Sequence, residues 1–373
     1  MDYTLMRGAV PDDGSCTSVN SACAQGLNAA DPTNILACVN NGCRYWATSW
    51  DPTAAYSTNG STVRGSLDPS HYQDFANYLS NYIASLRQYY GVTLYAISPQ
   101  NEPDVCADYA SSLWSGSVID DFVKNYLGPT MKSRGQWPET MIIIPDASQD
   151  TSNSLPSLAG PCMNDSACSV YVGVNDVHNY DNESVQNLYN VSHFWEGEIA
   201  GFTWNSINGP GCTNGAWCNT IRDAMTWADI YDREIAQSNM TGWNYWNFAQ
   251  GDQNDNGALI EGGIVSTRAY ILAEYAKYIR PGFAHIGATH AAQNGVTVSA
   301  YKSASGSFSI VATNQNSSDV NQTFTFNDVS PSSVTPTITS ASQQLQDLSS
   351  VSVSGGSFTY TLPAQSVITF HWQ

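Results

Sequence analysis

The stretch Thr93-Leu94-Tyr95-Ala96-Ile97-Ser98-Pro99-Gln100-Asn101-Glu102-Pro103-Asp104 decides the fold class of this chain. Its first half is a short apolar run, typical of a strand that is buried on both faces of a parallel sheet. Its second half places the carboxylate of Glu102 at the tip of that strand, beside Asn101 and before a proline that ends the strand. Because the catalytic groups of (β/α)8 enzymes lie at this end of the strands, the stretch predicts a barrel with Glu102 at its mouth.

A second acidic cluster, Trp195-Glu196-Gly197-Glu198, closes another short apolar run. Glycoside hydrolysis needs two carboxylates that flank the scissile bond, and the tips of two strands can supply them. Since side chains alternate along a strand, Glu196 and Glu198 are predicted to share one face of it. Geometry alone therefore leaves both residues open as the partner of Glu102.

The chain up to residue 280 alternates short apolar runs with longer amphipathic segments, which is the pattern of an α/β fold. Strands are predicted at residues 3–9, 44–49, 93–98, 141–145, 170–178, 192–198 and 242–248. The clearest helix begins at Asp68-Pro69, a capping residue followed by a proline at the first helical position, and others are predicted at 118–127, 219–236 and 267–279. We therefore predict a (β/α)8 TIM barrel over residues 1–280.

The remaining residues, 281–373, have a different character. Apolar and polar side chains alternate, and turns rich in Ser, Asn and Gly separate the runs 296–301, 308–313, 322–326, 335–340, 350–354, 357–362 and 365–372. This pattern predicts a C-terminal antiparallel β-sandwich domain.

The charge of the chain limits its partners. It carries 13 basic and 32 acidic side chains, for a net charge of −19. Such a chain is not expected to bind nucleic acid or an anionic membrane surface, and it suits a neutral ligand. No apolar stretch approaches the ~20 residues that cross a bilayer. We expect a monomer that acts on a polysaccharide.

The nine cysteines indicate an oxidising compartment, so we expect the protein to be secreted. Local spacings predict disulfides that close short loops, between Cys16 and Cys23, Cys38 and Cys43, Cys162 and Cys168, and Cys212 and Cys218, with Cys106 left over. No histidine lies at zinc-finger spacing, so no metal site is expected. Sequons for N-glycosylation occur at Asn59, Asn164, Asn182, Asn190, Asn239, Asn316 and Asn321.

Further motifs lie before, between and after the two acidic clusters. They are Ser49-Trp50-Asp51-Pro52, Thr58-Asn59-Gly60, His178-Asn179-Tyr180, Trp195-x-x-Glu198, Ile279-Arg280-Pro281-Gly282 and Leu362-Pro363-Ala364-Gln365-Ser366-Val367. With 95–104 they make the chain resemble glycoside hydrolase family 30, most closely its xylanase subfamily 8, over nearly its whole length.

The resemblance implies a (β/α)8 barrel joined to a β-sandwich and hydrolysis of β-linked polysaccharides with retention of configuration. It implies that Glu102 is the acid/base and Glu198 the nucleophile, since the distance from Trp195 favours Glu198 over Glu196. No cofactor and no metal are implied. Residues expected to contact the substrate or support the nucleophile are Arg7, Trp50, Asn101, His178, Tyr180 and Trp246.

Three departures from the family pattern carry expectations of their own. The chain starts where the family has its second barrel strand, so we expect it to be N-terminally incomplete, without the first strand. Gly197 stands where the family's Trp-x-Thr-Glu motif has threonine. The segment Trp246-Asn247-Phe248-Ala249-Gln250 lacks the arginines with which glucuronoxylan-specific members grip a uronic-acid branch.

The sequence thus predicts a secreted retaining endo-glycanase, in the first place an endo-β-1,4-xylanase that does not depend on glucuronic-acid branches. An endo-β-1,6-galactanase or β-1,6-glucanase with the same mechanism is the alternative enzyme. An inactive carbohydrate-binding pseudoenzyme is the alternative from another class.

Overall fold

The computed structural model describes residues 2–25, 32–149, 154–201, 218–251, 257–327, 329 and 331–372. Its internal contacts divide the chain into two compact units. The barrel unit comprises Leu5–Ile199 and Met240–Asn244. The sandwich unit comprises Met1–Thr4, Ala200–Asn239 and Tyr245–Gln373.

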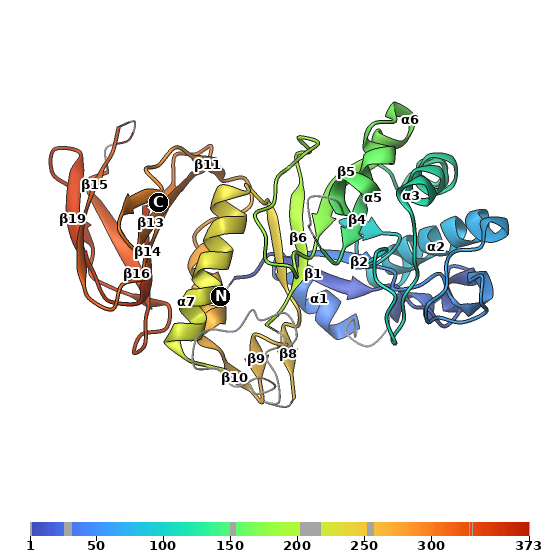
Figure 1. Ribbon diagram of the computed structural model, residues 1–373, viewed down its shortest axis with the longest axis horizontal. Helices are drawn as coiled ribbons and strands as arrows, with labels where there is room; N and C mark the ends of the chain where they lie inside the picture. Colours follow the sequence, from blue (N-terminus) through green and yellow to red (C-terminus); the bar gives the residue numbers. More distant parts are fainter. Residues whose placement is uncertain are drawn as a thin grey trace. The chain divides into compact units, whose positions relative to one another are not determined.

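The barrel unit is built on a seven-stranded sheet in which each strand pairs with the next strand along the chain, from β1 to β7 (Figure 1). The pairings from β1 to β6 are parallel. The strands are β1 (Leu5–Ala9), β2 (Arg44–Thr48), β3 (Ala96–Ser98), β4 (Met141–Ala147), β5 (Val172–Val177), β6 (Phe194–Ile199) and β7 (Gly242–Tyr245). Parallel neighbours end at the same edge, so the residues that follow each strand are brought together there.

The two faces of the sheet bury different sets of side chains. One face carries a small cluster made of Trp46, Ala96, Ile143, Val174 and Trp195. The other face packs on the helices in a larger core, to which the alternate residues Tyr45, Ala47, Ile97, Ile142 and Ile144 belong. Both faces therefore bury apolar side chains, as the continuous apolar strands predicted.

Six helices of the described chain cover the barrel unit. They are α1 (Pro32–Asn40), α2 (Tyr72–Tyr90), α3 (Gly116–Phe122), α4 (Gly128–Ser133), α5 (Ser154–Met163) and α6 (Ser166–Ser169). The longest, α2, follows a turn that the Asp68 side chain caps by accepting from the backbone N–H of Ser70 at 2.9 Å. It ends at Gly91, whose φ of 66° is the left-handed conformation in which glycine replaces a side-chain-bearing residue without cost.

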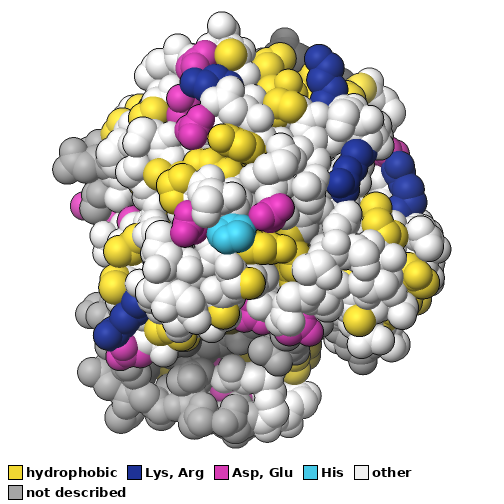
Figure 2. All heavy atoms as spheres, turned by 90° about the vertical axis from the view of Figure 1, so that its right-hand side faces the viewer, with side chains coloured by type: hydrophobic (Ala, Val, Ile, Leu, Met, Phe, Trp, Pro, Cys, Tyr) yellow, Lys and Arg dark blue, Asp and Glu magenta, His cyan; other side chains and the backbone are white. Residues whose placement is uncertain are grey.

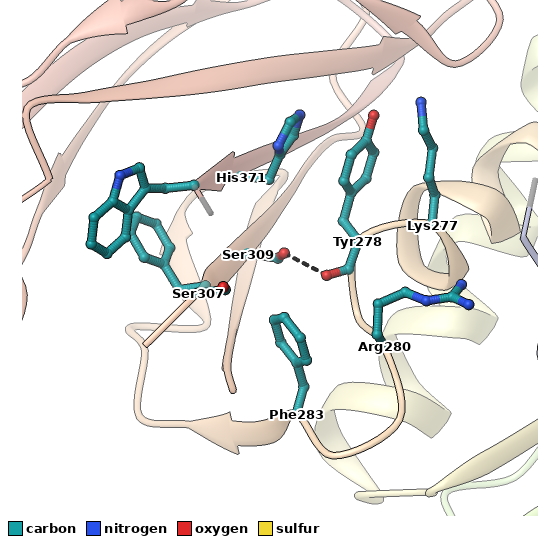
Figure 3. A pocket seen from close by; sticks show the side chains of 9 residues that line it. Lys277, Tyr278, Arg280, Phe283, Ser307, Ser309 and His371 are labelled. Atoms are coloured by element: carbon teal, nitrogen blue, oxygen red, sulfur yellow. Dashed lines mark hydrogen bonds between the residues drawn. The ribbon is translucent and has the colours of Figure 1, made fainter. Parts of the chain in front are cut away.

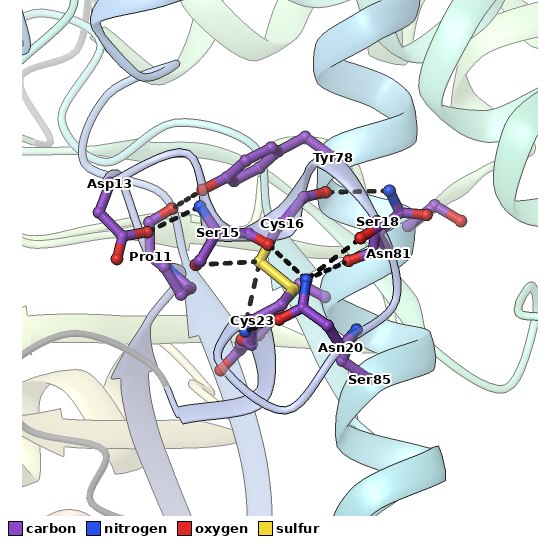
Figure 4. Close-up of a disulfide and its surroundings, with 12 residues drawn as sticks. Pro11, Asp13, Ser15, Cys16, Ser18, Asn20, Cys23, Tyr78, Asn81 and Ser85 are labelled. Atoms are coloured by element: carbon purple, nitrogen blue, oxygen red, sulfur yellow. Dashed lines mark hydrogen bonds between the residues drawn. A yellow bond between two sulfur atoms is a disulfide. The ribbon is translucent and has the colours of Figure 1, made fainter.

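A disulfide loop fixes the chain that follows β1 (Figure 4). Cys16 and Cys23 are bonded, and Asn81 of α2 donates to the carbonyl of Cys16 at 2.9 Å. Tyr78, one turn earlier on the same helix, donates to the carbonyl of Pro11 at 2.8 Å. The loop is thus held on α2, and with it the end of the strand that carries Arg7.

The sandwich unit contains α7 (Ile221–Tyr231), α8 (Thr267–Ala276) and the short strands β8 (Ala249–Gln250), β9 (Ile260–Glu261) and β10 (Ile264–Val265). Its two further sheets are antiparallel, with β15 paired to β19 and the other strands in the larger sheet. These strands are β11 (Ala284–Ile286), β12 (Ala291–Gln293), β13 (Val296–Lys302), β14 (Phe308–Asn314), β15 (Val320–Thr325), β16 (Ser333–Thr339), β17 (Gln346–Asp347), β18 (Val351–Ser352), β19 (Ser357–Leu362) and β20 (Ser366–Trp372).

The apolar layer between these two sheets makes them a sandwich. Phe370 of β20 lies 5.0 Å from Phe324 of β15 and 5.1 Å from Phe358 of β19, measured between ring centroids. The predicted C-terminal antiparallel sandwich is therefore confirmed. The domain boundary after residue 280 stays a prediction.

The other expectations about the fold compare as follows. Strand β3 begins at Ala96 rather than at residue 93, and β4 extends to Ala147, two residues beyond its predicted end. The three predicted disulfides Cys16–Cys23, Cys38–Cys43 and Cys162–Cys168 are present. Cys218 is also disulfide-bonded, whereas Cys212 lies outside the described residues. Cys106 is free and exposed. None of the helices in the described ranges combines the length and apolarity needed to cross a bilayer.

Candidate active site

Carboxylates from three strands of the barrel unit meet at the edge where the strands end. Glu102 follows β3, Asp146 lies in β4 and Glu198 lies in β6. Glu102 and Glu198 are only 6% and 8% exposed, and Asp146 is fully buried. Buried carboxylates need partners for their charge, and Arg7 and His178 supply them.

The backbone at this edge departs from ordinary strand geometry. Glu102, Asp146 and Asn179 have φ angles of 44°, 57° and 37°, in the left-handed region that non-glycine residues avoid. Each such residue costs of order 1–3 kcal/mol, and such residues gather at functional sites where the surrounding structure holds them. The amide of Glu102 donates to the carbonyl of Asp146 at 2.7 Å, which links two of the three positions.

Arg7 of β1 is the cation at the centre of the cluster. Its Nη1 donates to Oε2 of Glu198, and its Nη2 donates to Oδ1 of Asn101 at 2.6 Å and to the Asp146 carboxylate at 3.3 Å. Burial alone would lower the pKa of Arg7, but the Asp146 and Glu198 carboxylates outweigh it and raise that pKa. The guanidinium is therefore a permanent positive charge that ties β1 to β4 and β6.

Glu198 has two donors of its own. Besides Arg7, the hydroxyl of Tyr180 donates to its Oε1 at 2.9 Å. Burial raises the pKa of Glu198 above its ordinary value, His178 and Arg7 oppose this shift, and the charge of Glu102 adds to it. Both carboxylate oxygens are thus held in place by donors, as an attacking carboxylate requires.

His178, which follows β5, lies between two carboxylates. Its Nδ1 is 3.0 Å from Oε1 of Glu102, and its Nε2 is 2.9 Å from Oδ1 of Asp146. Burial would lower the pKa of His178, but the surrounding carboxylates, Glu198 first, raise it well above 6.5. With both ring nitrogens facing acceptors, the ring donates from both as an imidazolium.

The two candidate catalytic carboxylates are close together. A carboxylate oxygen of Glu102, a ring nitrogen of His178 and a carboxylate oxygen of Glu198 all lie within 4.8 Å of one another. Retaining glycosidases hold their two carboxyl groups about 5–5.5 Å apart, whereas inverting ones leave ≈ 6.5–9.5 Å for a water. The spacing fits the retaining geometry.

The remaining predicted site residues are placed as follows. Asn101 accepts from Arg7 through its Oδ1, so its amide nitrogen is the group that can donate to a sugar. Trp50 stacks under the Arg7 guanidinium, 4.9 Å from the ring centroid. Glu196 lies in the same strand as Glu198 and is fully buried. Trp246 belongs to the sandwich unit, and its role as a sugar platform stays a prediction.

Three residues of the site were not predicted from the sequence. Asp146 directly follows the apolar run Met141-Ile142-Ile143-Ile144-Pro145, and its position after that predicted strand was the available signal. Asp176 lies beneath the site in β5, where burial and the charge of Asp146 raise its pKa. Tyr109 donates to Oε2 of Glu102 at 3.1 Å from a loop that carries no recognisable motif.

A pocket elsewhere in the protein does not offer this chemistry (Figure 3). It lies in the sandwich unit, and its lining residues are Lys277, Tyr278, Arg280, Phe283, Ser307, Phe308, Ser309, His371 and Trp372. None of these is a carboxylate, so the pocket cannot provide the acid and the nucleophile of glycoside hydrolysis. On the face drawn in Figure 2, Lys and Arg side chains are scattered rather than gathered into a basic patch.

Comparison with known proteins agrees with this geometry. A family model, the glycosyl hydrolase family 30 TIM-barrel domain, matches residues 35–290. The chain belongs to glycosyl hydrolase family 30. The predicted (β/α)8 fold class and the prediction of a glycoside hydrolase are thereby confirmed.

Two relatives and one further structure illustrate the family 30 likeness. Glucuronoxylanase XynC of Bacillus subtilis (strain 168) is 27% identical over 349 residues, which cover 89% of this chain and 74% of the relative. The family 30 subfamily 8 xylanase Xyn30A from Clostridium acetobutylicum matches with a TM-score of 0.82 at 26% identity, over 99% of this chain and 88% of that chain. An endo-β1,6-glucanase shares the fold with a TM-score of 0.74 at 21% identity, over 99% of this chain and 82% of that chain.

Asp176 gives a physical reason for Gly197 in place of the family's threonine. A Cβ atom on residue 197 would overlap both carboxylate oxygens of Asp176. The carboxyl group thus fills the space that a side chain at residue 197 would need, and the two positions depend on each other.

We therefore expect Gly197→Ala to lower the free energy of unfolding by about 1–3 kcal/mol, the usual cost of overpacking a core. Asp176→Ala should restore much of this loss in the double variant, with a coupling free energy of about 0.5–3 kcal/mol in a double-mutant cycle. Denaturant unfolding measures the free energy of unfolding of the wild-type protein, the two single variants and the double variant. Gly287→Ala, where the added methyl group meets open space, is the control. Additive effects at residues 176 and 197 would contradict the account.

Proposed function

We propose that this family 30 protein is a retaining endo-β-1,4-xylanase in which Glu198 is the nucleophile and Glu102 the acid/base. The observation that carries the proposal is the pair of buried carboxylates whose oxygens lie within 4.8 Å of each other at the ends of two parallel strands. That spacing fits the shorter separation of the two carboxyl groups in retaining glycosidases, and so favours direct attack on the sugar by one carboxylate.

In the first step, Glu198 attacks the anomeric carbon while Glu102 gives its proton to the glycosidic oxygen. The bond to the leaving sugar breaks and a covalent glycosyl-enzyme forms. In the second step, Glu102 takes a proton from a water molecule, whose oxygen attacks the anomeric carbon and releases Glu198. The configuration at that carbon is inverted twice and is therefore retained.

The neighbours of Glu198 suit it for attack rather than for proton donation. Arg7 and Tyr180 both donate to its oxygens, and such donors stabilise the ionised form of a carboxylate.

Xylan is the substrate that the relatives favour. Both XynC and Xyn30A are described as acting on xylans, and they are 27% and 26% identical to this chain. A β-1,6-linked glucan or galactan is the alternative substrate class. An inactive carbohydrate-binding protein is not favoured, because such a protein has no need for paired carboxylates with donors on each.

We further propose that cleavage does not require glucuronic-acid branches. A buried uronate needs a fixed cation, and an arginine that binds both carboxylate oxygens is the usual device. The segment from Trp246 to Gln250 contains no basic residue. Arg64, another cation of the barrel unit, is engaged with Asp108 and with the carbonyl of Ala107.

The disulfides of the chain also support export to an oxidising compartment.

The nucleophile can be tested directly. Glu198→Ala should lower kcat on xylan by about 10⁴-fold or more, as when the nucleophile of a covalent mechanism is removed. Azide should restore part of the turnover of an activated aryl glycoside and give the glycosyl azide of inverted configuration. Glu196→Ala is the matched control in the same strand. Rescue by azide in Glu196→Ala, and not in Glu198→Ala, would show that Glu196 is the nucleophile.

The pH dependence of kcat/KM follows from the environment of Glu198. The nucleophile must be ionised, and its pKa is raised above 4.5, chiefly by burial. Activity should therefore fall as the pH drops through a value above 4.5. The Tyr180 hydrogen bond opposes the raised pKa, so Tyr180→Phe should move this acidic limb to higher pH. A limb that stays in place or moves to lower pH in this variant would contradict the assignment.

The substrate preference can be read from rates and products. We expect kcat/KM on arabinoxylan and on glucuronoxylan to differ by less than about tenfold, because a charge-assisted grip on a uronate would contribute more than that factor. Hydrolysis of a β-1,6-glucan under the same conditions tests the alternative. Products from glucuronoxylan that each carry one uronate at a fixed position would overturn the proposal.

A further inference from the structure

The two carboxylate oxygens of Glu102 have different neighbours. Oε1 lies 3.0 Å from Nδ1 of His178, which is completely buried. Oε2 accepts from the hydroxyl of Tyr109 at 3.1 Å. Tyr109 itself is 53% exposed, so Oε2 has a partner from a surface loop whereas Oε1 has a buried one.

His178 decides which of these oxygens can carry the catalytic proton. Its two nitrogens lie between Oε1 of Glu102 and Oδ1 of Asp146, at 3.0 and 2.9 Å. A ring that donates to both acceptors keeps Oε1 as an acceptor throughout the reaction. The proton that Glu102 transfers must then reside on Oε2, next to the Tyr109 hydroxyl.

The position of Tyr109 is set by the fold. Its loop is bridged to the loop that follows β2 through the backbone pairs Val63–Ala110 and Gly65–Ser112. Arg64, between those pairs, donates to the carbonyl of Ala107 at 3.2 Å and forms an ion pair with Asp108. The hydroxyl of an exposed tyrosine is in this way kept at hydrogen-bond distance from Glu102.

We propose that Tyr109 is a positioning residue for the acid/base, which holds Oε2 of Glu102 and stabilises the charge that this oxygen gains when its proton leaves. The inference rests on the proposed function, because it needs Glu102 as the acid. When the O–H bond of Glu102 breaks, the proton goes to the glycosidic oxygen and the electron pair stays on Oε2. A hydrogen bond from Tyr109 to this oxygen is then donated to an ionised acceptor and becomes stronger.

This role makes the contribution of Tyr109 depend on the leaving group. A sugar hydroxyl leaves only with a proton, so charge develops fully on Glu102. A dinitrophenolate leaves without one, so little charge develops there and the hydrogen bond gains little in the transition state. A tyrosine that served only as a stacking platform or as a loop support would affect both substrates alike.

The test compares Tyr109→Phe with the wild-type protein on xylan and on dinitrophenyl β-xylobioside, with kcat/KM as the measured quantity. The variant keeps the ring and removes only the hydroxyl. We expect a loss of about ten- to hundredfold on xylan, the size of one hydrogen bond to a charged group, and less than about threefold on the aryl substrate. Tyr89→Phe, at an exposed tyrosine of α2, removes a hydroxyl in the same way and should change neither rate.

A loss on the aryl substrate that equals or exceeds the loss on xylan would overturn the proposal, as would a loss below about threefold on xylan. Failure of the proposed function would be seen separately, in a wild-type protein that cleaves neither substrate. If the wild-type protein cleaves a different β-glycan, the ratio of kcat/KM between the wild-type protein and Tyr109→Phe is measured on that glycan and on its dinitrophenyl glycoside.

Discussion

The buried guanidinium of Arg7 is the interaction on which the site depends. A lone charge in the interior of a protein is expensive, and it persists only with carboxylates and acceptors around it. Arg7 finds Glu198 on β6, Asp146 on β4 and Asn101 after β3. These contacts fix the positions of strand ends that are far apart in the sequence. A shift of one strand end would leave Arg7 or a carboxylate unpaired. The second cation, His178, joins Asp146 to Glu102 in the same way.

The parallel sheet makes this convergence possible, and the local backbone completes it. Parallel strands bring their last residues to one edge. With ordinary strand geometry the backbone would continue there in the direction of the strand. The left-handed conformations of Glu102 and Asp146 redirect the chain at that edge. The strain is held by contacts from elsewhere, such as the hydrogen bond of Thr48 to Asp146 at 2.6 Å. Glu102 and Asp146 thus belong to the candidate site and also carry backbone strain that the rest of the structure must hold.

Much of the fold was predictable because its signals are local. Apolar runs, the Asp68-Pro69 helix start and the alternation after residue 280 each depend on neighbours in the sequence. Glu102 and Glu198 were predictable for the same reason, since each closes an apolar run. Alternation could not separate Glu196 from Glu198, because what supports Glu198 is its contact with Arg7 and Tyr180, which are distant in the sequence.

The parts that escaped prediction depend on contacts between distant segments. Tyr109 meets Glu102 only because the loop after β2 holds the loop after β3. Asp176 explains Gly197, but the two residues belong to different strands, and the glycine alone only marked a departure from the family pattern. The short helices α4 and α6, of six and four residues, have too few turns to show a periodicity.

The central claim is that Glu198, oriented by Arg7 and Tyr180, forms a covalent bond to the sugar. Incubation with a 2-deoxy-2-fluoro xylobioside that carries a dinitrophenyl leaving group should trap this intermediate, because the fluorine slows both steps and the activated leaving group restores the rate of the first step alone. Peptide mass spectrometry then locates the sugar. The account predicts a label on Glu198 in the wild-type protein and in Glu196→Ala. A label on Glu196 or Glu102, or rapid turnover to a product of inverted configuration without any label, would contradict it.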